Sequence, residues 1–198
     1  RKLYLKEDGS FYRFGEIQKN QEIADLLENI AEQGVDYFYK GKVAKQIVDL
    51  INDRGGCFDV SDMESYEPKF REPVKTTYRG YEVAAFAPPS GGCALVEMLN
   101  ILENYDVRSM GHNTAASIHA LTESMKLGFA DRSVALGDPD FVNVDVERLT
   151  SKKFAHERFT LAGEKAGEFA SADGIEAKQY PGNTSHFVVM DKDGNAFS

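Results

Sequence analysis

The sequence is short of cysteine and of positive charge, and it has no long apolar run. Two cysteines in 198 residues, Cys57 and Cys93, are too few for a disulfide scaffold. One disulfide bond between them is possible, but two buried thiols are expected. Because 23 Lys and Arg stand against 32 Asp and Glu, the net charge is −9, which argues against nucleic acid or an anionic membrane as the main partner. No stretch approaches the roughly 18 apolar residues of a membrane-spanning helix, so no membrane segment is expected.

The chain also lacks an initiator methionine and a signal peptide, since it opens on Arg1 and Lys2. We therefore expect a piece cut from a longer precursor. Its four histidines show neither an i, i+4 pair nor an accompanying pattern of acidic ligands, so neither a metal site nor a cofactor is expected.

What the sequence does contain is mostly helical patterning. Apolar residues recur at helical spacing over residues 17–31, in a helix that begins near Asn20, and over residues 42–52. These two helices are predicted to pack as a hairpin. Ser61 and Glu64 have the spacing of a capping box, which predicts a short helix beginning there.

The middle of the chain alternates strand and helix signals. β-Branched and aromatic residues around Arg79 and Gly80 predict two strands and a tight turn over residues 76–86. Helices are predicted at about residues 92–102, with Leu95, Met98, Leu99 and Leu102 on one face, and at residues 114–135, followed by a weaker helical segment over 146–158. In the helix at 114–135, the inward residues are expected to be Ile118, Leu121, Thr122, Met125 and Phe129.

The last forty residues change character. Residues 160–183 are rich in Ala, Gly, Glu, Lys and Ser, which predicts an exposed, mobile connection. Residues 185–190 have the composition of a buried strand, and residues 191–195 have hairpin-turn chemistry. The spacing of that turn does not fit a calcium loop of the EF-hand type.

Thr184 lies where this linker meets the strand. An N-terminal-nucleophile hydrolase needs such a residue, because cleavage before Thr frees an α-amine that can act as base for the side-chain hydroxyl. A Thr that simply begins a strand has the same appearance. Composition and spacing leave both interpretations open.

Several ordered motifs resemble those of γ-glutamyltranspeptidases. They are residues 77–83 (TYRGYEV), 88–92 (PPSGG), 99–106 (LNILENYD), 130–132 (ADR), 136–142 (LGDPDFV) and 184–195 (TSHFVVMDKDGN). The last resembles the opening of that family's small subunit.

This resemblance implies a fold class and a division of the chain. The expected fold is α/β (α+β), a four-layer αββα N-terminal-nucleophile hydrolase sandwich that is incomplete here and helix-rich. Residues 1–159 would be a helical and α/β portion of the large subunit, residues 160–183 a flexible linker, and residues 184–198 the first strand and turn of the small subunit.

The resemblance also implies an activity. The enzyme would be a γ-glutamyltransferase or glutathione hydrolase that cleaves itself between Asn183 and Thr184. Thr184 would then be the nucleophile that passes γ-glutamyl groups, from a small molecule such as glutathione, to water or an amino acceptor. No cofactor or metal is implied. The family is typically found outside the cell, in the periplasm or at the cell surface.

Other parts of the site are expected outside this chain. The family's basic clamp for the substrate α-carboxylate would lie upstream and its oxyanion-hole glycines downstream, so the missing segments are expected as partners and the fragment is expected to be inactive alone. Ser185 stands where the family usually has a second Thr. Alternatives are a relative acting on poly-γ-glutamate or on a β-lactam side-chain amide, or a non-catalytic binding or assembly domain.

Overall fold

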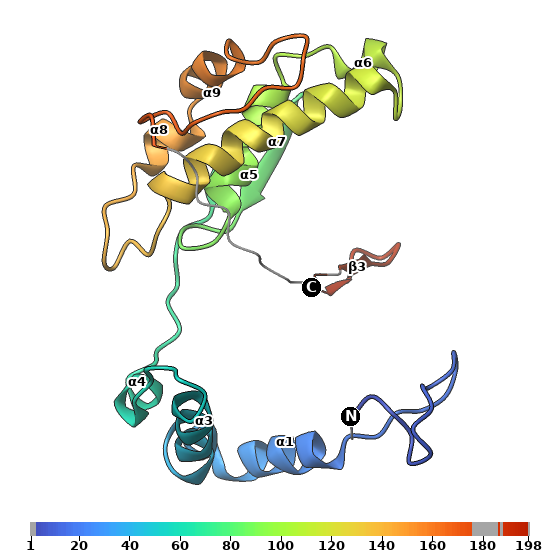
Figure 1. Cartoon of the computed structure of the whole chain (residues 1–198), viewed down its shortest axis with the longest axis vertical. Helices are drawn as coiled ribbons and strands as arrows, with labels where there is room; N and C mark the ends of the chain where they lie inside the picture. The colour runs from blue at the N-terminus through green and yellow to red at the C-terminus, as the bar shows by residue number, and fades with distance from the viewer. Residues whose placement is uncertain (1–2, 176–185, 187, 198) are drawn as a thin grey trace. The chain divides into compact units, whose positions relative to one another are not determined.

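The computed structural model describes residues 3–175, 186 and 188–197, and it divides the chain into two compact units (Figure 1). Unit 1 is Arg1–Lys69 and unit 2 is Phe70–Ser198. No helix among the described residues is long and apolar enough to cross a membrane. The boundary at Lys69 lies inside the segment 1–159, and the three-part division made from the sequence stays a prediction.

Unit 1 contains short helices around a small apolar core. Buried Ala44, Val48 and Met63 form that core, with partly buried aromatic and aliphatic side chains packed around it. The helices are α1 (Gln21–Gln33), α2 (Asp36–Tyr39), α3 (Lys42–Asn52) and α4 (Val60–Glu64).

The two long helices of unit 1 form where the apolar spacing predicts them. The Asn20 side chain accepts a hydrogen bond from the Ile23 amide at 3.2 Å and caps α1. The expected direct hairpin of the two helices is wrong in detail, because α2 lies between them in the chain and contacts both. α1 consequently has no buried residue.

The capping box of α4 lies two residues earlier than predicted. Asp59, not Ser61, is the N-cap, and its side chain accepts from the Ser61 amide at 2.9 Å. The Asp62 carboxylate accepts from the Asp59 amide at 2.8 Å. The sequence offers two overlapping boxes, and the one that begins in extended backbone at Asp59 forms.

Unit 2 places helices against an antiparallel hairpin of β1 and β2, with α5 in contact with both strands and with α7, α8 and α9. Its elements are β1 (Val74–Tyr78), β2 (Tyr81–Ala85), α5 (Gly92–Leu102), α6 (Val107–Met110), α7 (Ala115–Ala135), α8 (Val146–Thr150), α9 (Lys152–Phe159), β3 (Val189–Met190) and β4 (Ala196–Phe197).

The β1–β2 hairpin confirms the predicted turn. Val74 pairs with Ala85 and Tyr78 with Tyr81, so Arg79 and Gly80 are the two loop residues. Both have positive φ, 50° and 87°, as a tight two-residue hairpin turn requires. Gly80 therefore supplies a conformation that most residues adopt only with strain.

The predicted inward face of α7 is wrong for this structure, and the predicted apolar face of α5 is only partly buried. On α5, Leu95 is exposed, while the buried residues include Val96, Glu97 and Ile101. On α7 the predicted inward residues are all exposed, and the buried residues are Leu127 together with small and acidic side chains. The exposed α7 residues are Ile118, Leu121, Thr122, Met125 and Phe129.

Two further expectations need correction. The helical segment predicted over 146–158 is two helices, because Ser151 adopts an extended conformation that ends α8 and caps α9. Cys57 is an exposed free thiol, whereas Cys93 is buried as expected.

Candidate functional site

Asn183 and Thr184, the residues of the predicted processing site, lie outside the described residues. The structure does describe the chain that leads toward them and the turn that follows them. The geometry of these two flanks is what the structure contributes to the candidate site.

The upstream flank is a segment that lies along α7, and we call residues 162–172 the strap. Side chains of α7 bind its backbone at successive points: His119 Nε2 lies 2.8 Å from the Gly163 carbonyl oxygen, and Glu123 accepts from the Gly167 amide at 2.9 Å. The first part of the range expected to be an exposed linker is therefore anchored to the helix.

Apolar contacts support the same attachment. Ala162 and Phe169 of the strap pack against an apolar core formed by Ile101, Leu127 and Ala155, which come from α5, α7 and α9. These contacts explain why a segment poor in large apolar residues still has an ordered path, since its one large apolar side chain, Phe169, packs into the interior.

A group of buried polar side chains of unit 2 holds the end of the strap. We call Glu97, Asp131 and Arg158 the buried cluster. Arg158 Nε lies 2.7 Å from Asp131 Oδ2, and both side chains are less than a tenth exposed. Arg158 Nη2 donates to the Ala170 carbonyl at 2.7 Å, and Asp131 Oδ1 accepts from the Ala172 amide.

Glu97 completes the buried cluster in its protonated form. Burial, and then the hydrogen bond and negative charge of Asp131, raise the pKa of Glu97 to about 9, against the opposing effect of Arg158 and Arg148. At neutral pH the cluster therefore holds one ion pair and one neutral carboxyl group. This composition avoids an unbalanced buried charge.

Glu123 is a second buried carboxylate on α7, and it stays charged. Hydrogen bonds from Lys126 and from the Gly167 amide lower its pKa against the effect of burial. Lys126 Nζ lies 2.8 Å from Glu123 Oε1, so the charge has a partner. The two acidic residues of α7 thus bind two amides of one extended segment.

Downstream of the predicted processing site the chain forms the expected hairpin. β3 and β4 pair antiparallel, with Met190 opposite Ala196. The Asp191 carboxylate accepts from the amides of Asp193 and Asn195, both at 2.9 Å, and Gly194 has φ +84°. The Asn195 side-chain amide also donates to Asp191, at 2.8 Å. This bond first, and then the backbone amides, lower the pKa of Asp191 and account for the turn chemistry expected from the sequence.

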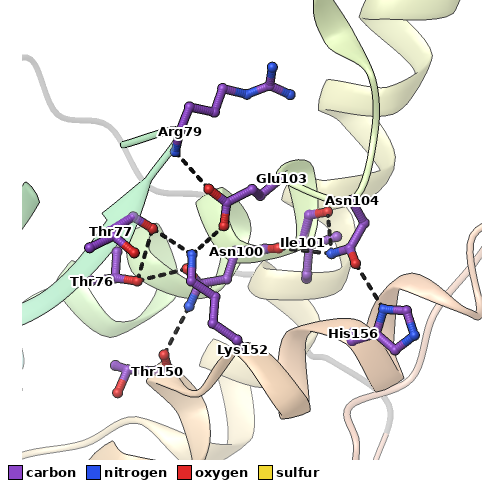
Figure 2. A network of polar contacts seen from close by, with 10 residues as sticks. All are labelled: Thr76, Thr77, Arg79, Asn100, Ile101, Glu103, Asn104, Thr150, Lys152 and His156. Atoms are coloured by element: carbon purple, nitrogen blue, oxygen red, sulfur yellow. Dashed lines mark hydrogen bonds and ion pairs between the residues drawn. The ribbon is translucent and has the colours of Figure 1, made fainter. Parts of the chain in front are cut away.

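A second polar network joins β1, α5 and the α8–α9 segment (Figure 2). Buried Asn100 accepts from Thr76 Oγ1 and donates to the Thr150 carbonyl, both at 2.8 Å. Asn104 Oδ1 lies 2.8 Å from His156 Nδ1. Asn100 thereby fixes the strand and the helical segment to α5.

Glu103 forms the exposed side of this network. It accepts from the Arg79 amide at 2.6 Å and pairs with Lys152, which also donates to the Thr77 carbonyl (Figure 2). These contacts lower the pKa of Glu103. Residues 99–106 and 77–83, which carry the resemblance, are thus joined by packing and hydrogen bonds.

Sequence reasoning missed the roles of the buried cluster and the strap. The one signal in the sequence is the motif at residues 130–132, which by itself gives no function for Asp131. Within the described residues, no group of three or more His, Cys, Asp or Glu side chains is arranged to hold a metal ion.

A close contact between two backbone segments explains why one position of residues 88–92 is glycine. A Cβ atom on Gly92 would lie 2.0 Å from the Phe86 carbonyl oxygen, so only glycine fits where α5 begins beside the end of β2. The motif here serves packing of the helix against the strand.

Comparison with known protein families gives a match over the whole chain. The family model described as gamma-glutamyltranspeptidase covers residues 1–198. The chain is 38% identical to the glutathione hydrolase proenzyme of Escherichia coli (strain K12), over 98% of this chain and 34% of that protein. It thus spans about a third of the length of that relative.

Solved structures agree with this match. Helicobacter pylori gamma-glutamyltranspeptidase superposes with a TM-score of 0.69 at 34% identity, covering 88% of this chain and 50% of the other. Cephalosporin acylase from Bacillus halodurans superposes with a TM-score of 0.68 at 32% identity, over 86% and 34% respectively. The predicted fold class, an incomplete α+β portion of an N-terminal-nucleophile hydrolase, is confirmed.

Proposed function

Because this chain belongs to the γ-glutamyltranspeptidase family, we propose that it is part of a proenzyme that cuts itself before Thr184 and then transfers γ-glutamyl groups. The observation that supports this most directly is a family match over residues 1–198, a range that includes residues 183–195. The Escherichia coli relative is named a glutathione hydrolase proenzyme, which fits an enzyme made as a precursor.

In the first proposed reaction Thr184 acts on its own peptide bond. Its Oγ attacks the Asn183 carbonyl carbon, the C–N bond breaks, and the nitrogen takes up the hydroxyl proton to become the free amine of Thr184. Water then hydrolyses the ester, which leaves a carboxylate on Asn183 and restores the hydroxyl group.

In the second proposed reaction the same residue acts on substrate. The free α-amine, with an ordinary pKa near 8, takes the proton from Thr184 Oγ as that oxygen attacks the γ-glutamyl carbonyl. The amine of the substrate leaves with a proton, and a γ-glutamyl ester remains on Thr184. Water or an amino acceptor then attacks the ester and regenerates the enzyme.

We test this function with the full-length protein. Wild type is expected to yield two fragments on a denaturing gel, and Thr184→Ala a single band. Thr184→Ser, which keeps a hydroxyl nucleophile, is the matched control and is expected to yield two fragments more slowly. Equal cleavage of wild type and Thr184→Ala would exclude Thr184 as the processing residue.

Turnover is measured on the same proteins with a chromogenic γ-glutamyl anilide and with glutathione. Processed wild type is expected to release the amine, and Thr184→Ala is expected to lose at least a thousandfold in rate. Since the chain spans about a third of its relative, we propose that the 198 residues alone have no turnover. A rate equal to that of the full-length protein would contradict this.

A second candidate substrate class is the side-chain amide of a β-lactam. The likeness to a cephalosporin acylase at 32% identity favours it. The nucleophile and the ester would be the same, and only the acyl group would differ. Competition between glutathione and a glutaryl- or adipyl-cephalosporin, followed by release of each amine, decides between the two.

A further inference from the structure

The strap leads into a closed turn, and we call residues 171–175 the exit turn. The Ser171 amide donates to the Ile175 carbonyl, and the Ile175 amide donates to Ser171 Oγ, both at 3.1 Å. The Gly174 amide donates to the Ser171 carbonyl at 2.9 Å, and Gly174 has φ +74°. Ser171 is only 5% exposed, so the turn closes on a buried side chain.

Two buried charged side chains hold the backbone on either side of Ser171. Arg158 donates to the Ala170 carbonyl, and Asp131 accepts from the Ala172 amide. The two side chains also neutralise each other at 2.7 Å, so charge balance alone does not require these further bonds. Because both bonds are to main-chain groups, they fix the position of the backbone itself.

A third helix contributes on the exposed side of the exit turn. Arg148 Nη2 of α8 lies 3.3 Å from Asp173 Oδ1. Side chains of α7, α8 and α9 therefore meet at residues 170–174, a stretch that contains only Ala, Ser, Asp and Gly. Such small side chains bury little apolar surface, so polar contacts determine where the chain lies here.

The exit turn is close in sequence to the predicted processing site. Eight residues, 176–183, separate Ile175 from Thr184. Eight residues span at most about 29 Å, whatever path they take. The bond to be cut therefore lies within that distance of a point that three helices hold.

The next hydrogen bond between the strap and a helix lies further upstream, where Glu123 accepts from the Gly167 amide. Without the contacts of the exit turn, the loop before Thr184 would have the 16 residues 168–183 in place of eight. The probability that a loop closes falls roughly as the 3/2 power of its length, so this doubling lowers it about threefold.

We propose that Asp131 and Arg158 are positioning residues for self-cleavage, because they hold the exit turn and so keep the loop before Thr184 short. The proposal rests on the proposed function, since it concerns the rate of that cleavage. A reacting bond must be held in a narrow geometry, and a shorter loop has fewer conformations outside it. Once the bond is cut, the exit turn is no longer joined to Thr184, so turnover of substrate should not depend on it.

A pair of insertions in the full-length protein tests the length of the loop. Eight Gly and Ser residues placed after Lys178 double the loop, and self-cleavage is expected to be about threefold slower. The same eight residues placed after Lys165 are the matched control, because they lie between the strap positions that His119 and Glu123 hold, upstream of the exit turn. The control is expected to cleave at the wild-type rate. Cleavage is followed on a denaturing gel after cell-free synthesis is stopped.

Two results of this comparison overturn the proposal. Equal slowing by both insertions would mean that the exit turn is not held in the precursor. Absence of slowing by the insertion after Lys178 would mean that the length of the loop has no effect on cleavage.

Substitutions separate positioning from stability. Asp131→Ala removes the bond to Ala172 and the carboxylate that pairs with Arg158, so self-cleavage is expected to slow about threefold. The kcat/KM per cleaved molecule, measured with a γ-glutamyl anilide, is expected to stay at the wild-type value. A purely structural role would lower both quantities, and an equal fall in both overturns the proposal.

A second variant leaves the buried ion pair in place. Proline has no amide hydrogen, so Ala172→Pro removes only the bond to Asp131. The loop then has the 13 residues 171–183 after Ala170, and self-cleavage is expected to be about twofold slower. Ala166→Pro is the matched control, because Ala166 is exposed and its amide has no hydrogen-bond partner among the described residues. Equal rates for the two proline variants contradict the role of the Asp131 contact.

Failure of the proposed function has a separate signature. If wild type is not cut, or if Thr184→Ala is cut as fast as wild type, the chemistry assigned to Thr184 is wrong and both proposals fail. If cleavage requires Thr184 but neither the insertion after Lys178 nor the substitutions change its rate, only the role of Asp131 and Arg158 is wrong.

Discussion

Units 1 and 2 are stabilised by contacts of different range. The ion pairs of unit 1 are exposed and mostly local, such as Lys40 with Asp36 and Lys45 with Asp49, each one helical turn apart. Unit 2 has buried polar contacts between distant segments, such as Asp131 with Arg158 and Asn100 with Thr150. Local contacts of the first kind contribute little stability, whereas loss of one partner from a buried pair is costly.

The two units are therefore vulnerable at different kinds of residue. Unit 1 depends on a few apolar side chains and on helix caps, because α1 buries no residue at all. Unit 2 depends on buried side chains whose partners come from distant segments of the chain. Substitutions that remove one member of a polar set should therefore affect unit 2 far more than they affect unit 1.

The largest effect is expected from Asp131→Ala. This change leaves the Arg158 guanidinium buried without its carboxylate, which costs about 3–5 kcal/mol of unfolding free energy. The measurement is denaturant unfolding, with hydrogen exchange at the Ala172 amide as a local probe. Asp173→Ala removes an exposed pair with Arg148 and is expected to cost under about 1 kcal/mol. Equal losses of unfolding free energy in the two variants would mean that the buried cluster stabilises the fold no more than an exposed ion pair does.

The next largest effect is expected in unit 1, from Met63→Ala. Met63 is 7% exposed in the three-residue core, and its truncation is expected to cost about 2–3 kcal/mol. Leu50→Ala, at a position 53% exposed, is the control and should stay within about 0.5 kcal/mol of wild type. A loss as large as that of Asp131→Ala would remove the contrast between the units.

Glu97→Gln is expected to change how stability depends on pH. The pKa of Glu97 is raised from 4.5 to about 9, so between these values the folded chain keeps a proton that the unfolded chain releases. The free energy of unfolding therefore falls as pH rises through this window, by at most about 1.4 kcal/mol per pH unit. Glutamine mimics the neutral acid and should flatten that slope in urea titrations at pH 5–9. An unchanged slope would assign it to other groups.

The smallest effects are expected from the local contacts of unit 1. Asn20→Ala removes the N-cap of α1 and is expected to cost about 1 kcal/mol. Lys45→Ala removes an exposed pair and should cost no more than about 0.5 kcal/mol. Both are measured by circular dichroism during thermal unfolding. A larger effect of Lys45→Ala than of Asn20→Ala would show that charge outweighs capping here.

Local signals allowed the sequence to predict most of the elements. Helical spacing and Asn20 located α1, the turn residues Arg79 and Gly80 located the β1–β2 hairpin, and residues 191–195 formed the expected turn. Each of these depends on a few neighbouring residues, and such short-range preferences are visible in a single sequence.

Burial in unit 2 was less predictable for a physical reason. Sequence reasoning assigns large apolar residues to the interior, so it chose Leu121 and Met125 as inward and gave no interior role to Glu97 or Asp131. A buried carboxyl group is stable only when a partner distant in sequence meets it, and Arg158 is 27 positions away from Asp131. The processing-site prediction for Asn183 and Thr184 depended on motif resemblance and stays a prediction.

The strap has a consequence for protein engineering. Because Glu123 and Asp131 of α7 accept hydrogen bonds from the backbone amides of Gly167 and Ala172, the number of residues between these two positions is fixed against the helix. One residue inserted there would move the second amide out of register with Asp131. The same insertion after Ile175 would leave both hydrogen bonds intact. Epitope tags and reporter sequences therefore belong beyond Ile175.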